Sequence, residues 1–406
     1  MSIRCKDLME LPSLQKLKLV AGRDGLDRVV RWVHVADVPQ VTDWVQGGEL
    51  LFITGIGIKK GTGTLLELID SVQKKKLSGL VINVGPYIQE IPEEAIKLAD
   101  SSGFPVFSLP WEVKLVEVTA DICRTIILKQ MEEKSLWDLV ENILFGPMEN
   151  QEIIIDRAAY YGYDLTNPHQ VAIVDVDDFA SYLKEAGIRD EKRVLEIKML
   201  FHQIIQEVLG RHKCKALSVL HSDSVIIILP TKGNEERLNK MLTEDIKESM
   251  SSKIPGMSVS IGLGNSSLWL KDLKESLIQA EQALAVAKMF KGRNQTLYYK
   301  EIGYYKLLFK MGHRTDLEEF FLETLGDLLT HDKNHGGELL STLNMYLEEN
   351  GNLARTIERL YVHRNTLKYR LEKIENLTGR SLGNAQDRLN LQMGLAVGRF
   401  LNMWTK

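Results

Sequence analysis

The stretch from Asn352 to Arg380, NLARTIERLYVHRNTLKYRLEKIENLTGR, constrains the fold more than any other part of the chain, because it carries its own start and stop signals. Asn352 is a suitable N-cap for a first helix at 353–360, and His363 is one for a second helix at 364–377. Gly379 then provides a C-terminal stop. Residues 361–363 leave room only for a short turn. The pattern predicts two helices joined by a tight turn.

The second of these helices is predicted to have two different faces. Leu367, Leu371 and Ile374 recur at positions i, i+4 and i+7, so one stripe should face a core. The opposite face is polar and can donate hydrogen bonds to base edges or phosphates. Its residues are Asn365, Tyr369, Glu372 and Lys373, flanked by Thr366 and Lys368.

Charge is concentrated in the same place. The whole chain has a net charge of −4, whereas residues 353–382 contain seven basic and three acidic side chains. Phosphate neutralisation dominates affinity for DNA, and the second helix of a helix-turn-helix enters the major groove. We therefore predict binding to double-stranded DNA at 352–378. The predicted base contacts are Asn365, Thr366, Lys368 and Tyr369, the predicted phosphate contacts are Arg355, Arg359, Arg364 and Arg370, and His363 and Lys373 complete the site.

The rest of the composition limits the class of protein. A length of 406 residues suggests two or three domains, and 44% hydrophobic with 26% charged residues is typical of a soluble globular protein. Cys5, Cys123 and Cys214 lie too far apart for a disulfide framework or a CxxC site, which suits a reducing cytoplasm. We expect a cytoplasmic protein with no signal peptide and no membrane span.

Strand and helix patterns alternate along residues 1–111. Strands are expected at 29–35, 50–54, 79–84 and 105–109, and helices at 65–76 and 93–101. Strands that are apolar throughout predict an α/β domain with helices on both faces of the sheet. Residues 112–147 then form a connector of one or two long helices, because 112–145 contain no glycine or proline. A coiled coil there is an alternative that the broken heptad at Lys129 weakens.

A second α/β pattern covers residues 148–300. Strands are expected at 170–176 and 258–263, a hairpin from 216–220 and 225–229, and helices at 191–209 and 270–290. From 301 to 406 every expected element is helical. His331 and His335 stand beside two glycines and lack the glutamate of a zinc-binding helix, so a solvated linker is expected there.

The predicted helix-turn-helix resembles two known kinds. LYVHRNTLKYRL is similar to the factor-for-inversion-stimulation type, with matches at Leu360, Val362, Arg364, Thr366, Leu367, Arg370 and Leu371. The longer stretch VHRNTLKYRLEKIENLTG, followed by Asp387, Arg388 and Leu389, resembles the C-terminal domain of PucR-type regulators, the purine-catabolism-regulator family. That resemblance implies a closing helix at 387–403.

The middle region is similar to the GGDEF pattern of diguanylate cyclases. The similarity rests on DVDDF at 175–179, VSIGLG at 259–264 and AEQALAVAKMFKGRN at 280–294. An active cyclase needs the D-x-D-x-F strand end to hold metal ions, and Asp175, Asp177 and Phe179 are present here.

Other parts of the cyclase pattern are missing. HSDSV at 221–225 aligns with the Gly-Gly-acid-acid-aromatic hairpin, so both glycines are gone and only Asp223 remains of the acids. Leu183 and Lys184 replace the Asn-Asp pair that reads guanine. We expect no enzymatic activity, no catalytic residues, no cofactor and no metal, and a degenerate domain that dimerises or relays a signal. Retained nucleotide binding is the alternative.

Residues 28–55 resemble the N-terminal domain of the PucR family. Polar groups near strand ends could line an effector pocket there, or could be turn residues. They are His34, Asp37, Glu49, Thr54 and Asn83.

The resemblances together imply a multidomain α/β protein. It would comprise an N-terminal α/β sensor, an α+β GGDEF-like middle domain and an all-α C-terminal helix-turn-helix domain. They imply a transcription regulator, often an activator, of a catabolic pathway such as purine, amino-acid or other nitrogen use. A small-molecule effector would control it, and a homodimer or higher oligomer would bind half-sites ~34 Å apart. The rival interpretations are a nucleotide-binding signalling protein or weak cyclase, and a helical module that binds a protein partner.

Overall fold

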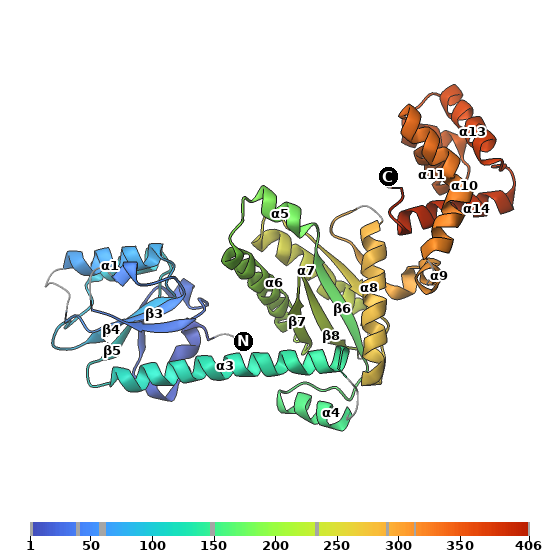
Figure 1. The fold of residues 1–406 in the computed structure, drawn as a ribbon. Coiled ribbons are helices and arrows are strands. Elements are labelled where there is room, and N and C mark those ends of the chain that lie inside the picture. The colour runs from blue at the N-terminus through green and yellow to red at the C-terminus, as the bar shows by residue number, and fades with distance from the viewer. Residues whose placement is uncertain are drawn as a thin grey trace. The chain divides into compact units, whose positions relative to one another are not determined.

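The computed structural model describes residues 3–37, 41–56, 62–146, 151–231, 235–289, 292–311 and 314–404. Contacts divide the chain into two compact units, Met1–Asp138 and Leu139–Lys406. The division falls inside a single helix, α3 (Leu115–Leu144), which is 30 residues long (Figure 1). Of the two alternatives for the connector, one long helix is therefore correct. The predicted domain limits at 111, 147 and 300 stay predictions.

The first unit contains a five-stranded sheet in the order β1-β5-β4-β3-β2. Strands β2 to β5 are parallel, as predicted for an α/β domain, and β1 pairs antiparallel with β5. The sequence did not predict β1, whose four residues are too few for a clear alternation. The strands are β1 (Lys18–Ala21), β2 (Trp32–Val35), β3 (Glu49–Ile53), β4 (Gly79–Val84) and β5 (Val106–Pro110).

Helices cover both faces of this sheet, which confirms the prediction. Helices α1 (Thr62–Lys74) and α2 (Glu93–Ser101) pack on the face that carries Leu51 and Leu80. The N-terminal 3-10 turn η1 (Cys5–Glu10) and α3 pack on the opposite face, against Phe52, Val81 and Phe107. Alternate residues of each strand thus enter two separate cores, which is why the strands are apolar throughout.

The middle part of the second unit is a mixed sheet in the order β10-β9-β6-β8-β7. All its pairings are antiparallel except β9 with β10, and β7 and β8 form the predicted hairpin. Helices α6 (Glu191–Arg211) and α7 (Glu235–Lys253) pack on one face. The strands are β6 (His169–Val176), β7 (Leu217–His221), β8 (Ser224–Pro230), β9 (Val259–Leu263) and β10 (Thr296–Tyr298), and the shorter helices are α4 (Gln151–Tyr160) and α5 (Phe179–Glu185).

Helix α8 (Leu273–Met289) packs against β6 and β9 at close range. A Cβ atom on Gly262 would lie 2.2 Å from the Ala280 carbonyl oxygen, and one on Gly264 would lie 2.0 Å from that of Ser276. Neither position has room for a side chain, so glycine is required there for the helix to approach the sheet.

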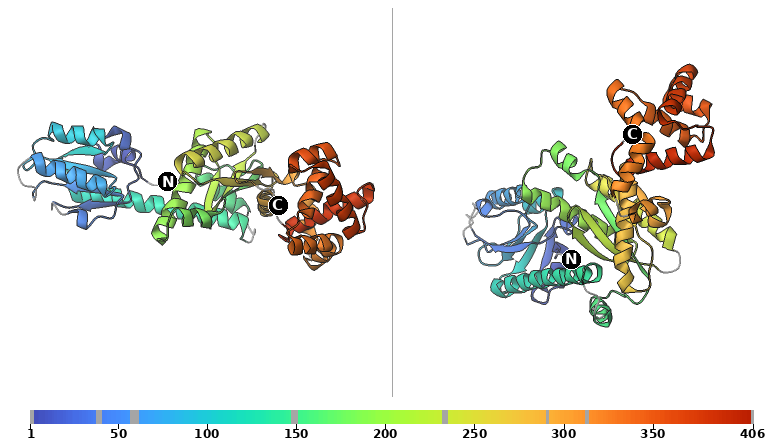
Figure 2. Two further views of the ribbon diagram at one scale, coloured as in Figure 1. Left: turned by 90° about the horizontal axis from the view of Figure 1, so that it is seen from above. Right: turned by 45° about the vertical axis from the view of Figure 1, so that its right-hand side comes forward.

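The described residues of the C-terminal part form helices and no strands, as predicted. Phe321, Leu325, Leu343 and Leu391 are fully buried in its core, to which Ala283 and Val286 of α8 also belong. Figure 2 shows this helical cluster from two further directions. The helices are α9 (Tyr305–Lys310), α10 (Arg314–His335), α11 (Leu339–Glu348), α12 (Leu353–Leu360), α13 (Arg364–Thr378) and α14 (Ala385–Phe400).

The expected linker at His331 and His335 is wrong. Both residues lie in the last turn of α10, and their rings stack with centroids 4.5 Å apart. Asp332, between them, accepts hydrogen bonds from the backbone N–H groups of Leu339 and Leu340 at 3.0 and 2.9 Å. This contact closes the α10–α11 corner, so the histidines belong to ordered helix.

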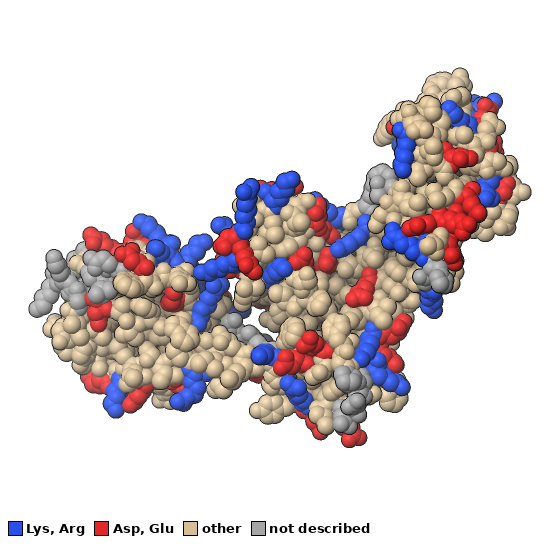
Figure 3. Space-filling view, viewed as in Figure 1, with Lys and Arg blue, Asp and Glu red and all other residues tan. Residues whose placement is uncertain are grey.

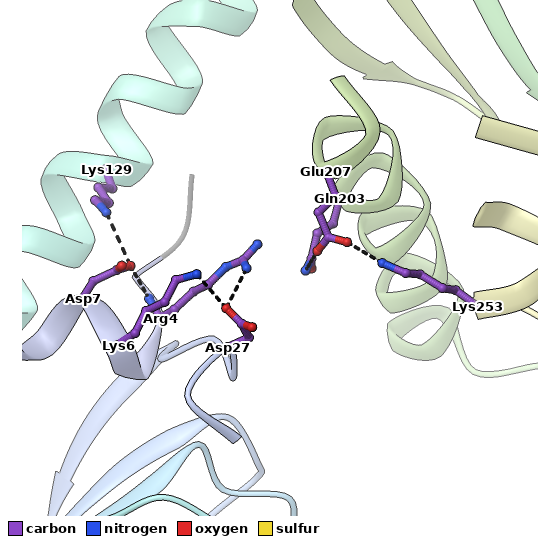
Figure 4. A network of polar contacts seen from close by, with 8 residues as sticks. All are labelled: Arg4, Lys6, Asp7, Asp27, Lys129, Gln203, Glu207 and Lys253. Carbon is purple, nitrogen blue, oxygen red and sulfur yellow. Dashed lines mark hydrogen bonds and ion pairs between the residues drawn. The ribbon is translucent and has the colours of Figure 1, made fainter. Parts of the chain in front are cut away.

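Ion pairs tie elements together within each unit (Figure 4). In the first unit, Asp27 accepts from Arg4 and Lys6 at 3.1 and 2.7 Å, and Asp7 lies 4.0 Å from Lys129 of α3. In the second, Lys253 at the end of α7 pairs with Glu207 of α6.

None of the helices in the described ranges is both long enough and apolar enough to cross a membrane.

Candidate nucleic-acid interface

Helices α12 and α13 are capped as the sequence predicts. Asn352 Oδ1 accepts the backbone N–H of Arg355 at 3.2 Å, and His363 Nδ1 accepts that of Asn365 at 3.3 Å. Gly379 adopts φ 63° at the C-terminal end of α13. These caps satisfy groups that a helix end leaves without an intrahelical partner, so both helices begin where the sequence places them.

The apolar stripe of α13 is buried, which confirms the prediction that one face of this helix packs against a core. Leu367 and Ile374 are fully buried and Leu371 is 8% exposed. They join the core formed with α10, α11 and α14, while the rest of α13 stays at the surface of the cluster (Figure 1). The leucines therefore hold the helix to the domain and leave its polar face available.

The first turn of α13 is open to solvent. His363, Arg364, Asn365 and Thr366 are all exposed, and so are Lys368 and Tyr369 one turn later. On α12, Arg355 and Arg359 are exposed as well. Of the predicted contacts, only Arg370 and Lys373 are half-buried. The structure thus brings the predicted residues together on two adjacent helices; whether they touch DNA stays a prediction.

Arg370 differs from the other predicted contacts because it faces α11. Its Nη1 lies 3.1 Å from Glu338 Oε2 and 3.2 Å from Thr342 Oγ1. The guanidinium is therefore engaged between two helices, and Arg370 is placed to hold α13 against α11. The sequence pattern missed Glu338 and Thr342, because residues about 30 positions away on another helix leave no local signal.

Acidic side chains also accompany two of the other cations. Arg359 Nη1 lies 2.6 Å from Glu349 Oε1 and 3.8 Å from Glu348 Oε2. Lys368 Nζ lies 3.7 Å from Glu372 Oε1, but both side chains are well exposed and such pairs contribute little. Arg355, near the start of α12, and Arg364, at the start of α13, are also exposed and therefore accessible to phosphate.

A surface groove runs beside α13. It is lined on one side by Thr366, Tyr369 and Lys373, and on the other by the α10–α11 corner with Glu338. Lys373 Nζ lies 5.8 Å from the centre of the Tyr369 ring, a cation–π contact that orients both side chains. Figure 3 shows both acidic and basic side chains over the C-terminal helices on the face in view, with many of the acidic ones gathered in one patch.

The acidic residues of the middle domain are held by the protein itself. Lys288 of α8 bonds to Asp175, and Lys198 Nζ lies 2.7 Å from Asp223 Oδ1. Burial raises the pKa of Asp175 above its usual range, and the Lys288 ammonium opposes that rise. Asp177 accepts from Ser258 Oγ, Ser260 Oγ and the Asn294 N–H at 2.8, 2.6 and 2.7 Å.

These contacts do not fit the metal–triphosphate complex of a cyclase. An ammonium group occupies a bonding position on each of Asp175 and Asp223, where a divalent cation would have to bind. Ser222 adopts φ 55°, a backbone conformation that glycine adopts readily. Its side chain stands where the cyclase pattern has a bare glycine backbone. Among the residues that the structure describes, no group of His, Cys, Asp or Glu is arranged to hold a metal ion.

We expect Asp177→Ala to destabilise the middle domain by about 3 kcal/mol, because three donors would lose their acceptor. Asp178→Asn is the matched control: Asp178 is exposed and lies 3.7 Å from Arg293, and asparagine tolerates the left-handed backbone of this position, φ 53°. Hydrogen exchange of the β6 and β9 peptides measures both variants. Equal protection in the two would show that Asp177 has no structural role.

The polar residues considered above for an effector pocket in the N-terminal domain form hydrogen bonds within turns and at strand ends. Asp37 accepts from the Thr54 N–H and hydroxyl, both at 2.6 Å, and from the Gly55 N–H at 2.8 Å. Glu49 accepts from two backbone N–H groups of the preceding turn. Asn83 donates to the carbonyl oxygens of Leu109 and Pro110. These bonds favour the turn alternative; His34 is half-buried in β2.

Three family models match the chain. A purine catabolism regulatory protein-like family matches residues 7–126, a GGDEF-like domain matches residues 146–286, and a PucR C-terminal helix-turn-helix domain matches residues 339–397. The last match contains α12 and α13.

Relatives of known role match the chain at low identity. The purine catabolism regulatory protein of Bacillus subtilis is 24% identical over 98% of this chain and 99% of its own length. The proline-responsive transcriptional activator PutR of the same organism is 25% identical over 68% and 65%, respectively. The carbohydrate diacid regulator of Escherichia coli is 25% identical over 70% and 72%.

Proposed function

The chain belongs to the PucR family of transcription regulators, and from this premise we propose that α13 reads DNA in the major groove under the control of a small-molecule effector. The observation that carries the proposal is the pairing of a buried leucine stripe with an exposed polar first turn on α13. Such an arrangement lets one helix be held rigidly and still present its N-terminal residues to base edges.

Individual residues take different roles in this proposal. Asn365, Thr366, Lys368 and Tyr369 face bases, and Arg355, Arg359 and Arg364 neutralise phosphates. Arg370 is a positioning residue, because its guanidinium is held by Glu338 and Thr342. His363 caps α13, and Lys373 borders the groove.

The proposed assembly is a homodimer on two half-sites. One helix of this kind contacts few base pairs, so two copies spaced by ~34 Å or a multiple of it are needed for a specific site. The effector would bind the N-terminal α/β domain at 1–111 or the middle domain at 148–300, and α3 would connect the two. The regulated genes would serve a catabolic pathway of purines, amino acids or another nitrogen source, usually by activation.

Titration of the full-length protein with its own upstream DNA tests this function. Fluorescence anisotropy should show a preference for that duplex over a scrambled one of at least ~10³-fold, as specific DNA-binding proteins do. Affinity should fall by ~0.9 log unit per phosphate contact for each log unit of salt. Equal binding to both duplexes, with and without purine breakdown products and amino acids, would contradict the proposal. No binding to either duplex at any salt concentration would instead indicate a helical module whose basic face contacts a protein partner.

The alternative of a nucleotide-binding protein or weak cyclase has a separate test. Incubation with GTP and magnesium should yield no cyclic dinucleotide, because the Asp175 and Asp223 carboxylates are paired with Lys288 and Lys198. Product formation, or a GTP-dependent rise in melting temperature, would favour the alternative.

A further inference from the structure

Tyr361, in the turn between α12 and α13, combines an unusual backbone with an unusual exposure. Its φ and ψ are 54° and 39°, the left-handed region that glycine adopts most readily. Eight described non-glycine residues have positive φ, and Tyr361 is the aromatic one among them. Its relative exposure is 95%, the highest among the exposed large hydrophobic residues that the structure describes.

The turn needs this backbone conformation but does not need a tyrosine. The Tyr361 N–H bonds to carbonyl oxygens of the last turn of α12, and the Val362 N–H bonds to the Ile357 carbonyl at 3.3 Å. Glycine would make the same bonds without the steric cost of a Cβ in the left-handed region. Because the ring is almost fully exposed, its burial does not offset that cost. The fold therefore supplies no reason for tyrosine here.

The position of the ring suggests what it contacts. Tyr361 lies two residues before the exposed sequence His363–Arg364–Asn365–Thr366, at the end of α13 that would enter the groove. Arg364 gives this end of the helix a positive charge, which suits phosphate. Tyrosine hydroxyls are among the side-chain groups that bond to DNA phosphate oxygens.

We propose that Tyr361 is a DNA-backbone contact: its hydroxyl donates a hydrogen bond to a phosphate oxygen beside the half-site, and its ring lies against the adjoining sugar. The proposal rests on the function proposed above and adds a contact that is neutral in charge. A neutral side chain displaces no counterion, so its contribution to affinity does not depend on salt in the way that a lysine contact does.

Two variants of the full-length protein test the contact. Tyr361→Gly and Tyr361→Asn both remove the ring, and both residues tolerate the left-handed region. Each should bind the upstream duplex about tenfold more weakly, since hydrogen bonds to charged groups contribute about this much. The slope of log K against log salt should equal that of the wild type. The melting temperature of the glycine variant should be at least that of the wild type.

A third variant is the matched control. Lys213→Gly removes the steric cost of a side chain in the left-handed region, φ 52°, in the middle domain. It should leave DNA affinity unchanged. If the wild type prefers its own duplex and the two Tyr361 variants bind it equally well, this inference is wrong and the proposed function stands. If both variants melt at a lower temperature, the ring supports the fold and the inference is also wrong. If the wild type shows no preference, the proposed function itself fails.

Discussion

Replacing Arg364 and Lys368 together by alanine should strongly weaken specific DNA binding without unfolding the protein. Both side chains are exposed on the first two turns of α13, and each base or phosphate contact of a cation contributes ~1–3 kcal/mol. We expect affinity for the upstream duplex to fall by roughly a hundredfold or more. The salt slope should fall by ~0.9 for each cation that neutralises a phosphate. Anisotropy over a salt series measures both quantities.

The control for charge is Lys16→Ala with Lys18→Ala. This variant removes two exposed lysines from the first unit, so the net charge of the chain changes by the same amount. It should bind DNA like the wild type. Both double variants should keep a free energy of unfolding within ~0.5 kcal/mol of the wild type, as exposed substitutions usually do. If the Arg364 and Lys368 variant kept the affinity and the salt slope of the wild type, α13 would not be the helix that contacts DNA.

Arg370 is unsuitable for this experiment, although the sequence places it in the same basic segment. Its alanine variant would lose the contacts to Glu338 and Thr342 that join α13 to α11. Weakened binding would then report a displaced helix as well as a missing phosphate contact.

Leu367→Ala should destabilise the C-terminal helices by about 2–5 kcal/mol, because truncating a fully buried leucine removes packing and leaves a cavity. Leu367 is the first residue of the buried stripe of α13, so α13 should be the element that loosens most. Hydrogen exchange of the α10 to α14 peptides should show this as a loss of protection. DNA affinity should fall with it, although Leu367 faces away from the polar surface.

Two control variants show whether the effect of Leu367→Ala comes from the loss of buried volume. Leu367→Met conserves volume and should cost less than ~1.5 kcal/mol. Leu389→Ala removes a leucine of α14 that is 51% exposed, and should cost at most ~0.5 kcal/mol. If Leu367→Ala lost no more protection than Leu389→Ala, the leucine stripe would not be what anchors α13.

The elements that the sequence predicted well are those with a strong local pattern. The β4 strand at Gly79–Val84 and the α2 helix at Glu93–Ser101 have the predicted limits, since an apolar run and a Pro-initiated amphipathic run mark them. The sequence missed β1 and β10, which are short and depend on a neighbouring strand for their hydrogen bonds. It also misread His331 and His335, because the Asp332 contacts that order this corner come from α11.

For the candidate site, the sequence by itself determined two helices, their caps, the turn and the buried leucine stripe. Each of these depends on residues at most seven positions apart, and capping and helical periodicity act over that range. Only the tertiary structure decided which cations stay accessible. Glu338, Thr342 and Glu349 reach Arg370 and Arg359 through the packing of α11 against α12 and α13. Electrostatic partners follow distance in space, which the spacing of charges along the chain does not record.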